Sequence, residues 1–275
     1  MSYQLLMMNS PARASASRLP LIAQLVFLAS AALWLGYFAQ VQGLRHASWT
    51  GGLVLLAAVA TTSLSMVSSL PVQNVITVSA LIAFLASVVE IINAKTGVPF
   101  GSRTCTEAIG PRLFGVLPWS LPLLWMVVIL NSRGVARLIL RPWRKTGKYG
   151  LWVIGLTAAL TALFDFNFEP FAARVGRFWI WSASSALPTW QGAPLTSFTG
   201  WLVVTVLILA FTTPWLINKS LSRSSTADFR PLIVWMVLNL LPPAACAVQH
   251  LWFAAMVAVS LSSVIIVFAI RGGRW

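Results

Sequence analysis

Long apolar runs follow one another along almost the whole chain, separated by short polar or basic stretches. The hydrocarbon core of a bilayer needs about 20 apolar residues for each spanning helix. On this spacing the sequence predicts about eight spanning helices, at 20–41, 51–68, 72–92, 116–135, 150–168, 199–217, 231–248 and 251–270. Strands of membrane barrels alternate polar and apolar residues instead. We therefore expect an all-α, polytopic transmembrane helical bundle that forms a single integral membrane domain over residues 1–275.

A bundle of seven helices is the alternative, in which the last two predicted spans form one continuous helix. Only Gln249 and His250 interrupt the apolar run between 231 and 270. A single helix there would need about 40 residues, which is twice the thickness of the membrane. We therefore predict a tight hairpin, with Pro242 and Pro243 kinking the first of its two helices, a distortion that neighbouring helices can accommodate.

The composition narrows the class and the partners of the protein. The chain is 58% hydrophobic and only 9% charged, whereas an ordinary soluble domain is about one-quarter charged, so a soluble enzyme is excluded. The net charge of +14 comes from basic residues between the apolar spans, where they contact lipid head groups, so no nucleic-acid partner is expected.

The same basic residues predict the topology. About two-thirds of the Lys and Arg residues fall on the side that carries both termini, including the basic N-terminal segment 1–19. This bias predicts an inner (cytoplasmic) membrane location with both termini in the cytoplasm. The first apolar run is longer than that of a signal peptide, which favours an uncleaved anchor.

Two connections on the predicted outer side do not have the composition of simple loops. Segments 93–115 and 169–198 mix aromatic residues, glycines, prolines and a few charges. They are too polar to span and too apolar to lie free in water, so we expect interfacial helices or re-entrant turns that close over a cavity. Their tryptophans form either an aromatic belt or part of a cavity wall.

The few acidic residues are the best candidates for chemistry. The topology gathers Glu90, Glu107, Asp165 and Glu169 in one layer beneath these connections, and ionisable groups at such depth usually face protein or a wet cavity. Asp165 and Glu169 share a helix face if the helix continues, although Pro170 makes that geometry uncertain. The alternative interpretation is ordinary ion pairing with neighbouring arginines.

No motif indicates a nucleotide, metal or redox cofactor. The two cysteines lie far apart and exclude a disulfide framework, and no zinc or phosphate-loop signature is present. We therefore predict no metal and no cofactor. A pocket of carboxyl and aromatic groups suits proton-driven chemistry on an apolar substrate.

Several sequence blocks carry a family resemblance. They are VEIINAKTGVPFG at 89–101, TEAIGPRLFGVLP at 106–118, the D-x-x-x-E-P of 165–170, and GAPLTSFTGW at 192–201. Together they resemble the carotenoid biosynthesis membrane proteins, a family that includes carotenoid hydratases. The sequence departs from that pattern at Arg103 and Cys105, where the family carries tyrosines, and at Ser197, where it carries asparagine.

The resemblance implies hydration of the terminal double bond of an acyclic carotenoid end group. A general acid protonates the less substituted carbon, and water captures the resulting tertiary cation. Burial raises the pKa of a carboxyl group and so suits it to the acid's role. On this basis Asp165 is the expected proton donor, Glu90 is the expected base or water-orienting group, and Glu169 is the alternative acid.

The same resemblance implies a substrate-binding surface. Aromatic faces stabilise a passing cation, by about 0.5–2 kcal/mol for each well-placed ring, which makes Trp179, Trp181 and Trp201 candidates. A turn that lets backbone approach the polyene is expected at Gly97, Pro99, Phe100 and Gly101.

Two other functions remain open at this point. An end-group cyclase would use the same cation and lose a proton instead of gaining water. A non-catalytic carotenoid-binding or scaffold protein would hold the pigment without turnover. The lipophilic carotenoid or isoprenoid is the expected partner in each case, together with membrane lipid, and other enzymes of the carotenoid pathway are possible partners.

Overall fold

The computed structural model describes residues 11–44, 46–182, 188–217 and 227–275. Within these residues eight helices are long and apolar enough to cross a membrane, which confirms the predicted all-α bundle and makes the chain a multi-pass membrane protein. They are α2 (Pro11–Phe38), α3 (Thr50–Val67), α4 (Val72–Thr96), α5 (Ser120–Ile139), α6 (Tyr149–Pro170), α7 (Leu195–Thr212), α8 (Arg230–Val248) and α9 (Trp252–Gly273).

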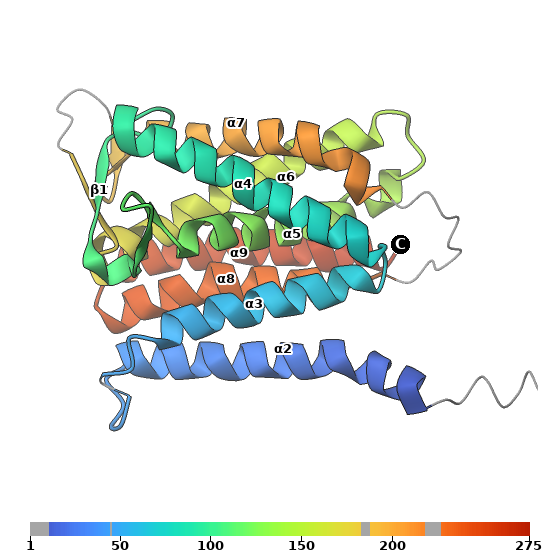
Figure 1. Ribbon diagram of the computed structural model, residues 1–275, viewed down its shortest axis with the longest axis horizontal. Helices are drawn as coiled ribbons and strands as arrows, with labels where there is room; N and C mark the ends of the chain where they lie inside the picture. Colours follow the sequence, from blue (N-terminus) through green and yellow to red (C-terminus); the bar gives the residue numbers. More distant parts are fainter. Residues whose placement is uncertain (1–10, 45, 183–187, 218–226) are drawn as a thin grey trace, which may run out of the picture.

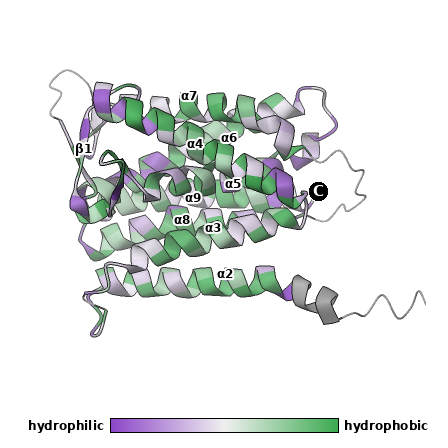
Figure 2. Ribbon diagram, in the orientation of Figure 1, coloured by the Kyte–Doolittle hydropathy of each residue, from purple (hydrophilic) through white to green (hydrophobic). Residues whose placement is uncertain are grey.

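The bundle is organised around α5. This helix contacts α3, α4, α6, α8 and α9, and it is the most buried of the eight. Its buried side chains include Trp125, Val127 and Ile129. The outer helices expose long apolar side chains instead, and this is the distribution that a lipid environment favours. Figure 2 shows that hydrophobic residues occur along the length of these helices.

The last two spans form the predicted hairpin, so eight helices are confirmed and seven are excluded. Helix α8 ends at Val248 and α9 begins at Trp252. His250 adopts a left-handed backbone conformation with φ of 64° in the turn between them. Pro242 and Pro243 lie inside α8, where both are buried.

The two ends of the bundle differ in character. The start of α2 and the C-terminus lie at one end, which we call the terminal end, and β1 lies at the other end (Figure 1). That second end, which we call the connection end, carries the polar connections after α4 and α6. Residues 1–10 of the basic N-terminal segment, Arg45, and the stretches 183–187 and 218–226 lie outside the described residues.

The two polar connections consist mainly of short paired strands and turns, where interfacial helices were one of the expected forms. The connection after α4 contains β1 (Arg103–Cys105), the single 3-10 turn η2 (Glu107–Ile109), β2 (Arg112–Leu113) and β3 (Leu117–Pro118); the connection after α6 contains β4 (Trp179–Trp181), β5 (Thr189–Trp190) and β6 (Ala193–Pro194). The antiparallel pair β1–β4 joins the two connections. The strands are only two or three residues long, and their pairing supplies hydrogen-bond partners for backbone groups in these connections.

Several helix boundaries differ from the prediction by a turn or more, and two of these differences affect the site. Helix α5 begins at Ser120 because Leu117–Pro118 is paired with β2 in a hairpin. Helix α7 begins at Leu195, directly after Pro194, four positions before the predicted start at 199. Hydropathy alone does not detect these boundaries, since the residues concerned are apolar in either conformation. The earlier start of α7 places Ser197 on the first helical turn, next to α6.

Candidate active site

A buried polar cluster lies at the connection end, where α4, α5, α6 and α7 meet the paired strands. In β1–β4 the register sets Arg103 opposite Trp181 and Cys105 opposite Trp179. Side chains alternate between the two faces of a strand, so Arg103 and Cys105 share a face. The pairing therefore brings the first connection directly over the C-terminal part of α6.

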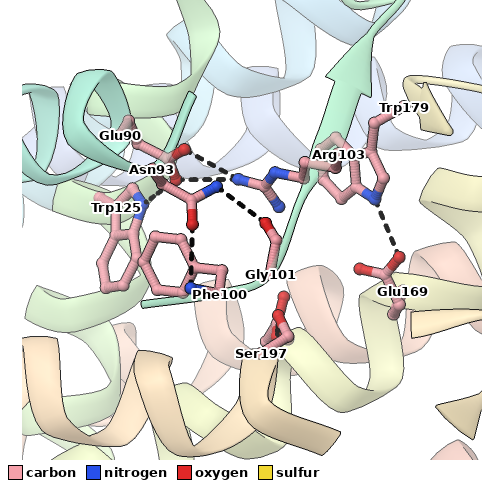
Figure 3. Close-up of polar contacts among 10 residues, drawn as sticks. Glu90, Asn93, Phe100, Gly101, Arg103, Trp125, Glu169, Trp179 and Ser197 are labelled. Carbon is pink, nitrogen blue, oxygen red and sulfur yellow. Dashed lines mark hydrogen bonds and ion pairs between the residues drawn. The ribbon is translucent and has the colours of Figure 1, made fainter. Parts of the chain in front are cut away.

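Glu90 and Arg103 form an ion pair inside this cluster. The Arg103 Nη2 atom donates to both carboxylate oxygens of Glu90, at 3.1 Å and 2.8 Å, and the Trp125 indole N–H donates to Glu90 Oε1 at 3.0 Å (Figure 3). The side chains of Arg103 and Glu90 are only 3% and 4% exposed. Ion pairing was the alternative interpretation of the acidic residues, and for Glu90 the structure shows it.

Arg103 also contacts aromatic rings, and the charges of two further acids act on it. Its guanidinium carbon lies 4.4 Å from the centroid of the Trp179 ring, within the range of a cation–π contact. Burial by itself would lower the pKa of Arg103, but the charges of Glu90, Glu169 and Asp165 together hold it above its usual value. Its Nη1 atom is buried and has no hydrogen-bond partner in the described part of the chain.

Asp165 and Glu169 lie on successive turns of α6, which continues through Pro170. Both residues are completely buried. The Ser197 hydroxyl donates to Asp165 Oδ2 at 3.0 Å, and the Trp179 indole N–H donates to Glu169 Oε1 at 2.8 Å. Trp181 donates to the same oxygen of Glu169.

Each of these two carboxyl groups has one buried oxygen without a hydrogen-bond partner among the described residues. These atoms are Asp165 Oδ1 and Glu169 Oε2. The helix therefore places two buried carboxyl groups on one face, as the spacing suggested, and Pro170 does not separate them. Buried polar atoms without a protein partner are unusual, and such atoms are the ones that a substrate or a water molecule can contact.

The turn after α4 covers one side of the polar cluster and packs on α7. Asn93 holds this turn, since its side-chain oxygen accepts from the Phe100 backbone N–H at 2.9 Å and its amide donates to the Gly101 carbonyl at 3.3 Å (Figure 3). A Cβ atom added at Gly200 of α7 would lie 2.8 Å from Phe100 Cδ1 and 3.0 Å from the Pro99 carbonyl oxygen. Glycine at 200 is therefore what lets the turn pack directly on α7.

Aromatic rings form the inner wall of the site. Trp125 and Trp201 stack with ring centroids 3.7 Å apart and an interplanar angle of 10°. Phe100 packs against both rings, with centroids 5.8 Å from Trp125 and 6.2 Å from Trp201. The indole nitrogen of Trp201 is buried without a partner in the described structure. The belt interpretation therefore does not describe Trp179 and Trp201, which lie inside the protein.

Most of the predicted site residues come together, with one exception among the acids. Glu107 does not join the cluster, because its side chain is 95% exposed and faces Arg112 at 3.5 Å. It lies on the outer surface of its connection, a position that a count of spans cannot distinguish from the inside. Gly97 ends α4 in a left-handed conformation with φ of 74°.

The structure adds four residues that sequence reasoning did not select as site residues, and one of them, Arg103, had been noted only as a departure from the family pattern and among the possible ion-pair partners. Asn93 lies within the block that carries the family resemblance, so a signal for it was present. Ser197 was noted only as a departure from the family pattern, and its contact with Asp165 depends on where α7 begins. Trp125 lies in an ordinary apolar helix, and nothing in the sequence distinguishes it from the other tryptophans.

The fold and this site together define a multi-pass helical membrane protein with carboxyl groups enclosed by aromatic rings. The sequence profile of the family described as "Carotenoid biosynthesis protein" matches residues 50–267, and the chain belongs to this family. This confirms the resemblance that the sequence blocks suggested.

A curated relative points in the same direction. The chain is 29% identical over 126 residues to a protein named bisanhydrobacterioruberin hydratase from Haloarcula japonica. The matched stretch is 45% of this chain and 40% of that relative, so it spans less than half of either protein. No solved structure matches the chain.

Proposed function

We propose that this protein adds water to the terminal double bond of an acyclic carotenoid end group. The observation that carries the proposal is the pair of completely buried carboxyl groups, Asp165 and Glu169, each with an oxygen that has no partner among the described residues. Membership of the carotenoid biosynthesis family and the name of the relative supply the class of substrate.

The charges in the cluster suggest how a proton is held. Arg103 is paired with Glu90, and the charges of Glu169 and Asp165 act on the same guanidinium without an ion pair of their own among the described residues. A buried charge without a partner is costly, so a cluster of this composition favours keeping one proton on the α6 pair. Glu169 accepts from two indole N–H groups, which favour its ionised form, so we assign the proton to Asp165.

The proposed reaction then balances within the pair. Asp165 gives its proton to the less substituted alkene carbon, which breaks the π bond and leaves a tertiary cation on the neighbouring carbon. Water attacks that carbon through oxygen and transfers one proton to Glu169, and the proton returns to Asp165. The net change is the addition of one water molecule.

The contacts favour Glu169 over Glu90 as the group that takes the proton from water. Arg103 already donates to both oxygens of Glu90, and Trp125 donates to one of them. Glu169 keeps a free oxygen one helical turn from Asp165. In this scheme Glu90 positions Arg103. The cation is surrounded by the aromatic rings of Phe100, Trp179, Trp181 and Trp201. The turn that covers the site is shaped by Gly97, Pro99 and Gly101.

The decisive test is co-expression with a pathway that makes lycopene, followed by mass analysis of the pigments. The wild-type protein should yield a pigment heavier by one water, and Asp165→Asn should yield none at an equal level of membrane protein. Asp228→Asn is the matched control, because Asp228 pairs with Arg230 near the start of α8, outside the cluster.

Other results would decide between the remaining functions. A new pigment of unchanged mass would indicate an end-group cyclase. Unchanged pigment that copurifies with the protein would indicate a carotenoid-binding or scaffold role. Full activity of Asp165→Asn would remove Asp165 from the mechanism.

We further propose a single domain over residues 1–275 in the cytoplasmic membrane, with both termini in the cytoplasm. The basic residues Arg144, Lys145 and Lys148, between α5 and α6, support this orientation because they lie at the terminal end with the start of α2 and the C-terminus (Figure 1). A fluorescent protein fused to the C-terminus should then fluoresce, since it folds in the cytoplasm. A fusion with alkaline phosphatase at the same position should be inactive.

A further inference from the structure

A second site is present at the connection end, apart from the carboxyl cluster. A hollow of about 610 Å³ lies between the end of α6 and the turn that joins α8 to α9. Its lining residues are Arg174, Val175, Arg177, Gln249 and Leu251. The proposed reaction assigns no role to any of these residues, so an inference about this hollow does not depend on that reaction.

The hollow is positively charged. Arg174 and Arg177 both line it and are both exposed, and neither forms an ion pair with any acidic residue that the structure describes. Among the described residues, no acidic side chain lines the hollow. Two guanidinium groups at one hollow leave several N–H donors directed at a shared space, an arrangement that suits phosphate because guanidinium binds phosphate oxygens in pairs.

Hydrogen bonds fix the frame of this hollow. Arg174 Nε donates to the Gln191 carbonyl at 3.3 Å, which leaves the outer nitrogens of its guanidinium available. The backbone of Arg177 is held by the Thr106 hydroxyl, which donates to the Arg177 carbonyl. On the opposite side Gln249 Nε2 donates to the Phe38 carbonyl at 3.2 Å. Three separate elements therefore hold the walls of the hollow in place.

The position of the hollow favours a lipid as the source of the phosphate. The apolar span that contains α6 ends at Val175, and the last apolar span begins at Trp252, directly after Leu251. The hollow therefore lies where the hydrocarbon layer ends and head groups begin. From that level the exposed side chains of Phe253 and Met256 continue along α9 and offer an apolar surface to acyl chains.

We propose that this hollow binds the phosphate of an anionic phospholipid through Arg174 and Arg177. The head group occupies the hollow, and its acyl chains lie along the exposed face of α9. Arg174 belongs to the π-helical turn η4 (Phe171–Val175), which directly follows Glu169 and Pro170. A bound lipid therefore also fixes the end of α6 against the α8–α9 turn.

The test is native mass spectrometry of the full chain in detergent, with phosphatidylglycerol or phosphatidylcholine added separately. We expect one retained phosphatidylglycerol molecule and weaker retention of phosphatidylcholine, whose choline group places a positive charge near the arginines. The double variant Arg174→Gln/Arg177→Gln should retain phosphatidylglycerol about tenfold less, the loss expected for about 1.4 kcal/mol of charge-assisted hydrogen bonding.

The control removes equal charge at the terminal end. Arg144→Gln/Lys145→Gln changes two exposed basic residues between α5 and α6 and should leave retention unchanged. Equal loss in both double variants, or no loss in either, would contradict a specific site.

Two measurements on the wild-type protein need no variant. Equal retention of the two lipids would refute the preference for an anionic head group. Displacement of the lipid by millimolar inorganic phosphate would assign the hollow to free phosphate and overturn the lipid assignment, whereas retention of the lipid in phosphate would support it.

Discussion

The buried ion pair of Glu90 and Arg103 makes a sharp prediction about stability. In Arg103→Met the carboxylate of Glu90, only 4% exposed, keeps the Trp125 N–H as its one hydrogen-bond donor. Removing one partner of a buried pair costs about 3–5 kcal/mol, because an uncompensated charge remains inside. Loss of the contact with the Trp179 ring adds about 0.5–2 kcal/mol. We therefore expect Arg103→Met to lower the free energy of unfolding by at least about 3 kcal/mol.

A second substitution separates the charge from the packing. Glu90→Gln/Arg103→Met removes both charges together, and the glutamine side-chain oxygen can still accept from Trp125. Replacing both members of a buried pair is often close to neutral. The double variant should therefore be more stable than Arg103→Met alone, by about 0.5–3 kcal/mol, the range of coupling between contacting residues.

The measurement is unfolding of the purified protein in mixed micelles with increasing SDS, followed by tryptophan fluorescence. Arg112→Met is the matched control, because Arg112 lies in the same connection but is 33% exposed and faces the exposed Glu107 at 3.5 Å. Exposed pairs contribute about 0–1 kcal/mol. Equal losses in Arg103→Met and Arg112→Met, or no recovery in the double variant, would refute the reasoning.

Three further predictions concern packing and reactivity. Gly200→Ala should destabilise the protein despite the higher helix propensity of alanine, because the added Cβ meets the turn at Pro99. The control is Gly155→Ala on α6, whose added Cβ meets nothing within 4 Å; it should stabilise the protein by up to about 1 kcal/mol in an SDS titration. Asn167→Ala should lower the free energy of unfolding by about 1–3 kcal/mol in the same assay, because the Asn167 amide donates at 3.1 Å to buried oxygens on α8 and α9. A loss smaller than that of an exposed Asn→Ala change would contradict this prediction. Burial raises the pKa of the Cys105 thiol. In a Cys246→Ala variant, maleimide labelling of Cys105 should therefore be slow at neutral pH and should accelerate only at a higher pH than for a free thiol. Rapid labelling at pH 7 would show that the thiolate is already present.

The limits of the sequence are clearest at the candidate site. Hydropathy and charge place Glu90, Asp165 and Glu169 at one end of the bundle, and the structure confirms that gathering. The same reasoning included Glu107, which points outward. The distinction depends on how the strand Arg103–Cys105 is paired, because pairing with Trp179–Trp181 determines which side chains face inward. A two-stranded pair between distant segments leaves no periodic signal in so few residues.

The sequence by itself determined the helical bundle and the family of the protein, and it predicted about eight spans with seven as an alternative. Apolar length and charge placement act locally along the chain, and short family motifs are read directly from it, so none of these needs a three-dimensional arrangement. Only the tertiary structure decided that Arg103 pairs with Glu90, that Ser197 contacts Asp165, and that two arginines line a hollow near Gln249. These contacts join side chains from different elements of the fold, and they depend on distances of a few ångströms that are set by helix packing and by the pairing of β1 with β4.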